Sequence, residues 1–548
     1  MFKLQCTDSF CVTVCNSDGL VGCDDGVLCI LIRSTEVHTK LGSLRGTYVS
    51  VKGKEAGVHA YLGVPFAKPP VGPALRFAAP QPVEGWEGVK DATQQPPMCV
   101  QDREQFLDLI DTLGMTLAHI PDISEDCLYL NIYTPTSRVM VWIHGGGFTM
   151  GSASMYDGSA LAAYQEVVVV LIQYRLGLLG FLSTGDEHMS GNFGMLDQVE
   201  ALRWIQQHIH NFGGDPDLVT IFGESAGGVS VSLLLLSPLS DGLFHHAIAE
   251  SGTAAMDILF SKELLPLMQV NYYCTYFVFK CFSVHSAENI TTQNLYFSKL
   301  LTWIPHIFID GHFLTKPVDE LFHKHELLTL PFMTGVNNDE GGWILTAVSV
   351  NAALKFVQLN SLLIFLHESM KVIELLIEEY LGIGDDRVKN REGITELLGD
   401  VLFNIPAIKT ANSHRDAGAP VYLYEYQHPP KFLQVKRPSF VGTDHGDEIF
   451  TVLGFCFTTT HVKLAGEYEE QLSKMMMSYW GNFARTGSPN GDGLVHWPKY
   501  GAEEEYLAIG LKKQVTGQHL KKDRFVFLTQ TLPEKVQQLT EKMEHSEL

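Results

Sequence analysis

The chain has 548 residues, of which 45% are hydrophobic and 18% are charged, which is enough apolar material for a large core and too little charge for an intrinsically disordered protein. Its formal net charge of −23 makes nucleic acid or an anionic membrane an unfavourable main partner. The longest apolar stretch, residues 167–182, is interrupted by Gln173 and Arg175, so we expect no transmembrane segment.

The amino-terminal residues differ in composition from the rest of the chain. Five of the ten cysteines fall within the first thirty residues. Residues 1–33 lack the basic start and the continuous apolar run of a secretory signal peptide, and we find no readable signal there. We therefore predict an atypical amino-terminal segment over residues 1–35, followed by a single domain over residues 36–548.

Strand-like and helix-like patterns then alternate along the chain. Residues 167–172 are a continuous run rich in β-branched residues, as in a strand buried on both faces. Residues 195–209 carry apolar side chains at helical spacing. Similar patterns predict strands at 139–143, 218–222, 331–336 and 421–426, and a helix at 229–236. This alternation without repeats favours an α/β fold with one mostly parallel sheet covered by helices on both faces, and such sheets place their sites at the carboxyl ends of the strands.

A serine motif follows the strand predicted at 218–222. Gly223-Glu224-Ser225-Ala226-Gly227 matches the pattern G-x-S-x-G, in which a sharp strand-to-helix turn exposes the serine as a nucleophile. The amino terminus of the following helix provides partial positive charge where an oxyanion would form. The alternative is an ordinary tight turn with no catalytic role. The strand before the motif and the helix after it argue against this alternative.

A glycine-rich loop follows the strand predicted at 139–143. In His144-Gly145-Gly146-Gly147-Phe148, successive N–H groups can point at one atom because no Cβ blocks the approach. Such donors stabilise the tetrahedral intermediate of acyl transfer. A flexible glycine loop is the alternative, and the order of glycine loop and then serine motif argues against it.

Two further stretches complete a resemblance. Together with residues 61–70 (Tyr-Leu-Gly-Val-Pro-Phe-Ala-Lys-Pro-Pro) and 124–131 (Ser-Glu-Asp-Cys-Leu-Tyr-Leu-Asn), these motifs resemble the type-B carboxylesterase family, which includes liver carboxylesterases. The resemblance covers roughly residues 38–252 and 310–548. It implies an α/β-hydrolase fold and a serine carboxylesterase that acts on small-molecule carboxylic esters, and on some amides and thioesters, with no metal site and no organic cofactor.

The resemblance also implies a catalytic triad of Ser225, Glu340 and His445. From the residues alone, Asp339 is as eligible as Glu340, and His445 is one of 22 histidines. The implied oxyanion hole consists of three N–H groups, those of Gly146, Gly147 and Ala226. The order serine, acid, histidine is the one expected of this fold.

Supporting residues follow from the same resemblance. Its buried polar network beside the triad falls on Glu224, Ser251 and Glu448. Its structural ion pairs fall on Arg76 with Glu125 and on Arg175 with Asp197, and its disulfides on Cys99 with Cys127 and on Cys274 with Cys281.

Two short signals indicate a lumenal protein. Asn289-Ile290-Thr291 is an N-glycosylation sequon. The ending His545-Ser546-Glu547-Leu548 resembles the HDEL-type signal that a retention receptor binds in the lumen of the endoplasmic reticulum. We therefore expect a protein of that lumen, or a secreted one.

Three alternatives remain to be weighed. A cholinesterase would need an aromatic seat for a quaternary ammonium group, and residues 100–126 contain no tryptophan. A non-catalytic esterase-like adhesion or scaffold protein would typically lack a triad residue, and here all three are present. An inactive product of a misassembled gene is the third alternative, because residues 254–308 match the family poorly.

Overall fold

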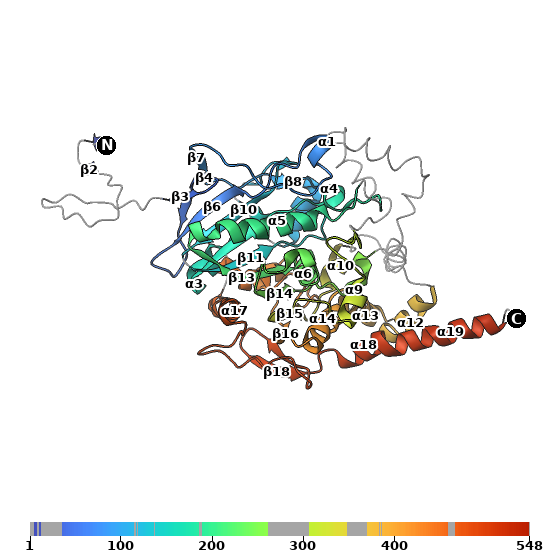
Figure 1. The fold of residues 1–548 in the computed structure, drawn as a ribbon. Helices are drawn as coiled ribbons and strands as arrows, with labels where there is room; N and C mark the ends of the chain where they lie inside the picture. Colours follow the sequence, from blue (N-terminus) through green and yellow to red (C-terminus); the bar gives the residue numbers. More distant parts are fainter. Residues whose placement is uncertain are drawn as a thin grey trace.

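The computed structural model describes residues 5–7, 10–12, 35–113, 117, 119–135, 137–185, 189–260, 306–347, 370–382, 384, 386–458 and 466–546. Within these ranges a central sheet of eleven strands has the order β18-β17-β16-β15-β14-β13-β11-β12-β10-β6-β5 (Figure 1). The strands are β5 (Thr47–Val49), β6 (Val58–Pro65), β10 (Tyr129–Thr134), β11 (Ser137–Ile143), β12 (Val167–Ile172), β13 (Gly214–Glu224), β14 (His246–Glu250), β15 (Phe332–Asn337), β16 (Val421–Tyr426), β17 (Glu505–Ile509) and β18 (Gln514–Gln518).

The middle of this sheet is parallel and its edges are antiparallel. From β12 through β11 to β17, each strand pairs in parallel with its neighbour. At the edges, β10, β6, β5 and β18 pair antiparallel. The predicted mostly parallel sheet is therefore confirmed, whereas no pattern in the sequence predicted the antiparallel edges.

Helices cover both faces of the sheet. Side chains of β11 alternate between two cores, with Val139 and Val141 in one and Met140 and Trp142 in the other. The first core contains apolar residues of α5 (Phe193–His208), α6 (Ala226–Leu234) and α14 (Ile405–Asp416). The second contains those of α3 (Ser159–Gln165) and α17 (Glu467–Thr486). Burial of β12 on both faces explains its run of β-branched residues.

The predicted elements agree with the structure apart from their ends. The strand predicted at 218–222 is longer on both sides, because β13 runs over Gly214–Glu224. The helix predicted at 229–236 begins three residues earlier, because α6 starts directly after Ser225. The helix predicted at 195–209 is α5, and its last residue passes into a short 3-10 turn, Ile209–Phe212.

One disulfide and two ion pairs join segments that are separated in the sequence. Cys99 and Cys127 form the predicted disulfide, with 5.0 Å between their Cα atoms. The two predicted ion pairs are also present, with Arg76 Nε 2.6 Å from Glu125 Oε2 and Arg175 Nη2 2.7 Å from Asp197 Oδ1. Cys274, Cys281 and Asn289 lie outside the described residues, so the second disulfide and the glycosylation site stay predictions.

The two ends of the chain lie apart from the sheet. Near the amino terminus, β1 (Gln5–Thr7) and β2 (Phe10–Val12) form an antiparallel pair. At the other end, α19 (Leu532–Ser546) extends away from the body of the molecule (Figure 1). Among the described residues, no helix is both long enough and apolar enough to cross a membrane. The division of the chain at residue 35 remains a prediction.

Candidate active site

The serine motif forms a tight turn between β13 and α6. Ser225 has φ 57° and ψ −124°, a backbone conformation that L-residues adopt only at a cost. Its N–H donates to the carbonyl oxygen of Glu250 at 2.9 Å, which anchors the turn to β14. A Cβ on Gly223 would lie 2.5 Å from the carbonyl oxygen of Ile143, and one on Gly227 would collide with the same carbonyl. The turn therefore needs glycine at both positions.

The glycine loop and the serine turn meet at one edge of the sheet. Strand β11 ends beside β13, where Ile143 pairs with Gly223. The chain continues from β11 to β12 on one side and returns to β13 on the other, which makes this a topological switch point. Gly145 packs directly on the serine turn, because a Cβ built on it would lie 3.0 Å from Cβ of Ser225.

The predicted oxyanion donors lie in these two turns. Gly146 has φ 105° and Gly147 has φ 60°, and Ala226 begins α6. In the part of the chain that the structure describes, the N–H groups of these three residues donate to no acceptor. They remain free to bind a developing negative charge.

Three side chains that are distant in sequence touch in series. His445 Nε2 lies 2.8 Å from Ser225 Oγ, and His445 Nδ1 lies 2.7 Å from Glu340 Oε2. Glu340 follows β15, and His445 lies in the segment between β16 and α16 (Ile449–Val452). Asp339, the rival acid, instead accepts the N–H of Gly442 at 2.6 Å. The structure thus brings together the three residues predicted as a triad.

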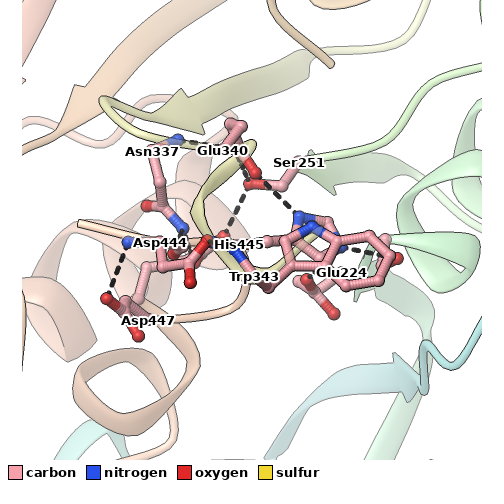
Figure 2. Close-up of polar contacts among 10 residues, drawn as sticks. Glu224, Ser251, Asn337, Glu340, Trp343, Asp444, His445 and Asp447 are labelled. Carbon is pink, nitrogen blue, oxygen red and sulfur yellow. Dashed lines mark hydrogen bonds and ion pairs between the residues drawn. The ribbon is translucent and has the colours of Figure 1, made fainter. Parts of the chain in front are cut away.

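A buried polar network surrounds Glu340 (Figure 2). The Ser251 hydroxyl lies 2.6 Å from Glu340 Oε1 and 3.1 Å from Glu448 Oε1. Asn337 donates its N–H to Glu340 Oε1 and its Nδ2 to Glu448 Oε2, both at 2.6 Å. Asn337 was not predicted as a member of this network, because an amide side chain at the end of an apolar strand is its only signal in the sequence.

Buried charges set the proton balance at His445. Burial lowers the pKa of His445, but the charges of Glu224, Glu340 and Glu448 and the hydrogen bond to Glu340 raise it to about 10. Burial in turn raises the pKa of Glu224 to about 8 and that of Glu448 to about 7. The positive charge of the imidazolium opposes this rise at both carboxyl groups. The carboxylates and the imidazole are therefore coupled, and loss of a carboxylate charge weakens the hold of His445 on its proton.

Aromatic rings flank the imidazole. The ring of Trp343 stacks near His445, with 5.9 Å between centroids and 27° between planes. The ring of Phe403 lies closer, with a centroid distance of 4.3 Å. Phe403 is carried by a π-helical turn, Asp400–Asn404, and such turns are frequent at functional sites. Neither ring was predicted, because their spacing to the triad residues carries no signal in one sequence.

Comparison with known proteins agrees with this geometry. A family model described as "Carboxylesterase family" matches residues 33–528. The chain is 44% identical to a cocaine esterase of Oryctolagus cuniculus over 93% of this chain and 98% of that protein. It is 45% identical to a fatty acyl-CoA hydrolase precursor (medium chain) of Anas platyrhynchos over 90% of this chain and 92% of that protein. It is 44% identical to a liver carboxylesterase of Sus scrofa over 93% and 95% of the two chains.

A match over most of the chain and this level of identity show the family as well as the fold. The chain belongs to the carboxylesterase family, and it is a carboxylic ester hydrolase with the α/β-hydrolase fold.

Proposed function

We propose that the chain cleaves esters through an acyl-enzyme on Ser225, with His445 as the general base and Glu340 as the group that orients it. The observation that carries this proposal is the pair of contacts at the imidazole, 2.8 Å to the Ser225 hydroxyl and 2.7 Å to the Glu340 carboxylate. A carboxylate on Nδ1 fixes the tautomer in which Nε2 accepts a proton, and it stabilises the imidazolium that results.

The reaction proceeds in two halves. Ser225 Oγ attacks the carbonyl carbon of the ester while His445 Nε2 takes the hydroxyl proton. The carbonyl oxygen becomes an oxyanion, which the N–H groups of Gly146, Gly147 and Ala226 bind. The intermediate collapses, the bond to the alcohol breaks, and His445 returns the proton to the leaving oxygen. Water then attacks the acyl-enzyme by the same route and releases the carboxylic acid.

The surrounding groups hold this machinery in place. Ser251 and the N–H of Asn337 both contact Glu340 Oε1, which leaves Oε2 to face the imidazole. Each oxyanion donor contributes about 3 kcal/mol of barrier lowering in comparable enzymes.

The substrate class follows from the relatives and from the charge of the chain. We propose a broad range of neutral or cationic small-molecule esters, with thioesters included, because one relative is named a fatty acyl-CoA hydrolase. Among oxygen esters, the net charge of −23 favours neutral or cationic substrates over anionic ones, whereas the inclusion of thioesters is proposed from that relative alone. A non-catalytic scaffold role is not favoured, because two relatives that match 90% or more of the chain are named an esterase and a hydrolase.

We also propose that the protein resides in the lumen of the endoplasmic reticulum. A retention receptor would bind His545-Ser546-Glu547-Leu548, and Asn289 would carry a glycan. The Cys99–Cys127 disulfide fits an oxidising compartment, and Cys274 with Cys281 would form a second one. Expression in cells tests this: we expect a glycan sensitive to endoglycosidase H, and secretion once residues 545–548 are deleted. A full-length chain that lacks a glycan and stays in the cytosol would refute the lumenal assignment.

Labelling tests the catalytic proposal directly. The purified protein is treated with a fluorophosphonate probe, and p-nitrophenyl butyrate hydrolysis is followed in parallel. We expect covalent modification of Ser225 and loss of hydrolysis in step with labelling, with neither in Ser225→Ala. Hydrolysis that persists in Ser225→Ala, or a probe attached to another residue, would overturn the assignment.

A further inference from the structure

The segment that carries Glu340 and the segment that carries His445 are joined by hydrogen bonds outside the triad. The amide of Asn337 donates through Nδ2 to the carbonyl oxygen of Asp444 at 2.8 Å. Further bonds between the two segments run from Thr443 N to Asn338 Oδ1 at 3.2 Å, from Gly442 N to Asp339 Oδ2 at 2.6 Å, and from Asp339 N to Thr443 O at 2.9 Å. These four hydrogen bonds, three of which involve a side chain, therefore hold the segments of Glu340 and His445 together.

Asp444 is the residue at which these contacts concentrate. Its Oδ1 accepts two backbone N–H groups at 2.9 Å, that of Trp343 in the acid segment and that of His445 in the base segment. The N–H of Asp444 donates to Asp447 Oδ2 at 2.8 Å, and Asp444 is 1% exposed. A single carboxylate oxygen therefore ties the backbone of the catalytic base to the helix that follows the catalytic acid, α10 (Gly342–Ala347) (Figure 2).

The charge of this buried carboxylate is balanced nearby. Burial raises the pKa of Asp444 to about 6, while Arg437, the two N–H donors and His445 oppose that rise. Arg437 Nη1 lies 2.8 Å from both carboxylate oxygens of Asp447, the neighbour that accepts the Asp444 N–H. At neutral pH Asp444 is therefore mostly ionised, and an ionised oxygen is the stronger acceptor.

We propose that Asp444 is a positioning residue for ester hydrolysis: by accepting both N–H groups on one oxygen, it sets the placement of the His445 imidazole between Glu340 and Ser225. The proposal rests on the proposed roles of those three residues. Catalytic groups need placement to within about 0.5 Å, and a misplacement of about 1 Å can lower the rate roughly 100-fold. This role requires an oxygen atom that accepts the two N–H groups, and it does not require the negative charge of Asp444.

Two substitutions separate the acceptor from the charge. Asp444→Ala removes the acceptor, and Asp444→Asn keeps an oxygen in its place but removes the charge. With p-nitrophenyl butyrate as substrate, we expect Asp444→Ala to lower kcat roughly 10- to 100-fold with KM changed less than about twofold. We expect Asp444→Asn to retain kcat to within about threefold.

A matched control exists on the surface. Asp386 Oδ1 likewise accepts two backbone N–H groups, from Val388 at 2.9 Å and from Lys389 at 3.3 Å, as the amino-terminal cap of α13 (Arg387–Gly399). Asp386→Ala removes the same kind of contact away from the triad, and we expect its kcat to match that of the unaltered protein.

Several results would overturn the proposal. One is an Asp444→Ala protein whose kcat stays within about twofold of the unaltered enzyme. Another is a folded Asp444→Asn protein as slow as Asp444→Ala. Should Asp444→Ala fail to fold, hydrogen exchange on the unaltered protein decides: the amides of Trp343 and His445 must be protected, and exchange as fast as in an open loop refutes the proposal. Failure of Ser225 labelling in the unaltered enzyme would instead refute the catalytic assignment.

Discussion

The Oε1 atom of Glu224 lies 3.2 Å from the same imidazole nitrogen of His445 that faces the Ser225 hydroxyl. The residue directly before the proposed nucleophile therefore lies against the proposed base. Burial lowers the pKa of His445, whereas the charge of Glu224 is the largest influence that raises it.

Glu224→Gln should move the pH profile. Removal of the Glu224 charge lowers the pKa of His445, so the base loses its proton at lower pH. We expect the acid limb of kcat/KM against pH to move to lower pH, with kcat on the plateau changed less than about tenfold. The measurement is a pH series with p-nitrophenyl butyrate. An acid limb that stays in place or moves upward would show that Glu224 does not act on His445.

The same charges should make folding stability depend on pH. A carboxyl group whose pKa is raised by folding binds its proton more tightly in the folded protein than in the unfolded one. The protonated group therefore stabilises the fold at low pH. For Glu224 this stabilisation is lost as pH rises from the pKa of the unfolded state toward about 8. His445 has the same sign, and its stabilisation is lost as pH rises toward about 10. We expect Tm to fall across this range, and to fall less in Glu224→Gln. Equal slopes in the two proteins would contradict this.

Ser251→Ala tests whether Ser251 supports Glu340, the proposed acid of the triad. The substitution removes the hydroxyl that lies 2.6 Å from Glu340 Oε1 and leaves only the N–H of Asn337 on that oxygen. Loss of a hydrogen bond to a charged group costs about 1.5 to 3 kcal/mol, so we expect kcat to fall roughly 10- to 100-fold where that cost appears in the transition state.

A second buried serine provides the control for this experiment. Ser232 in α6 is fully buried, and its hydroxyl has no hydrogen-bond partner within the described residues. Ser232→Ala should leave kcat unchanged and should not lower Tm, because no bond is lost. A loss of kcat equal to that of Ser251→Ala would mean that buried serines matter here only for packing.

Removal of the first disulfide should destabilise the protein. Cys99 and Cys127 are 28 residues apart, and closure of a loop of this length stabilises a fold by roughly 3 to 4 kcal/mol. We expect the double variant Cys99→Ser/Cys127→Ser to lose about that much free energy of unfolding, measured by urea denaturation. The free thiol of Cys456 offers a control, because Cys456→Ser breaks no cross-link. Equal losses in the two variants would show that the cross-link contributes nothing.

The turn at Ser225 and the glycine loop could be predicted from the sequence because each is a local pattern. Ser225 lies between a strand and a helix that were both recognisable, and β11 and β13 lie side by side because their apolar runs share one parallel sheet. The motif itself fixes the conformation of the turn, since glycine is required on both sides of Ser225.

The remaining triad residues depended on a resemblance. His445 is 220 residues from Ser225, and no local pattern encodes a contact over that separation. Glu340 and Asp339 are neighbouring acids in one turn, and only the folded chain shows that Asp339 bonds the N–H of Gly442. Asp444 and Phe403 were missed for the same reason, because their contacts form only when distant segments meet.

The backbone of the serine turn has a consequence for variants that lack the hydroxyl. The positive φ of Ser225 is held by its N–H bond to Glu250 and by the crowding at Gly223 and Gly227, and none of these contacts involves the serine oxygen. Loss of that oxygen therefore leaves the conformation of the turn intact. Such a protein would behave as a receptor for intact esters, which suits it to the capture of natural ligands from tissue extracts.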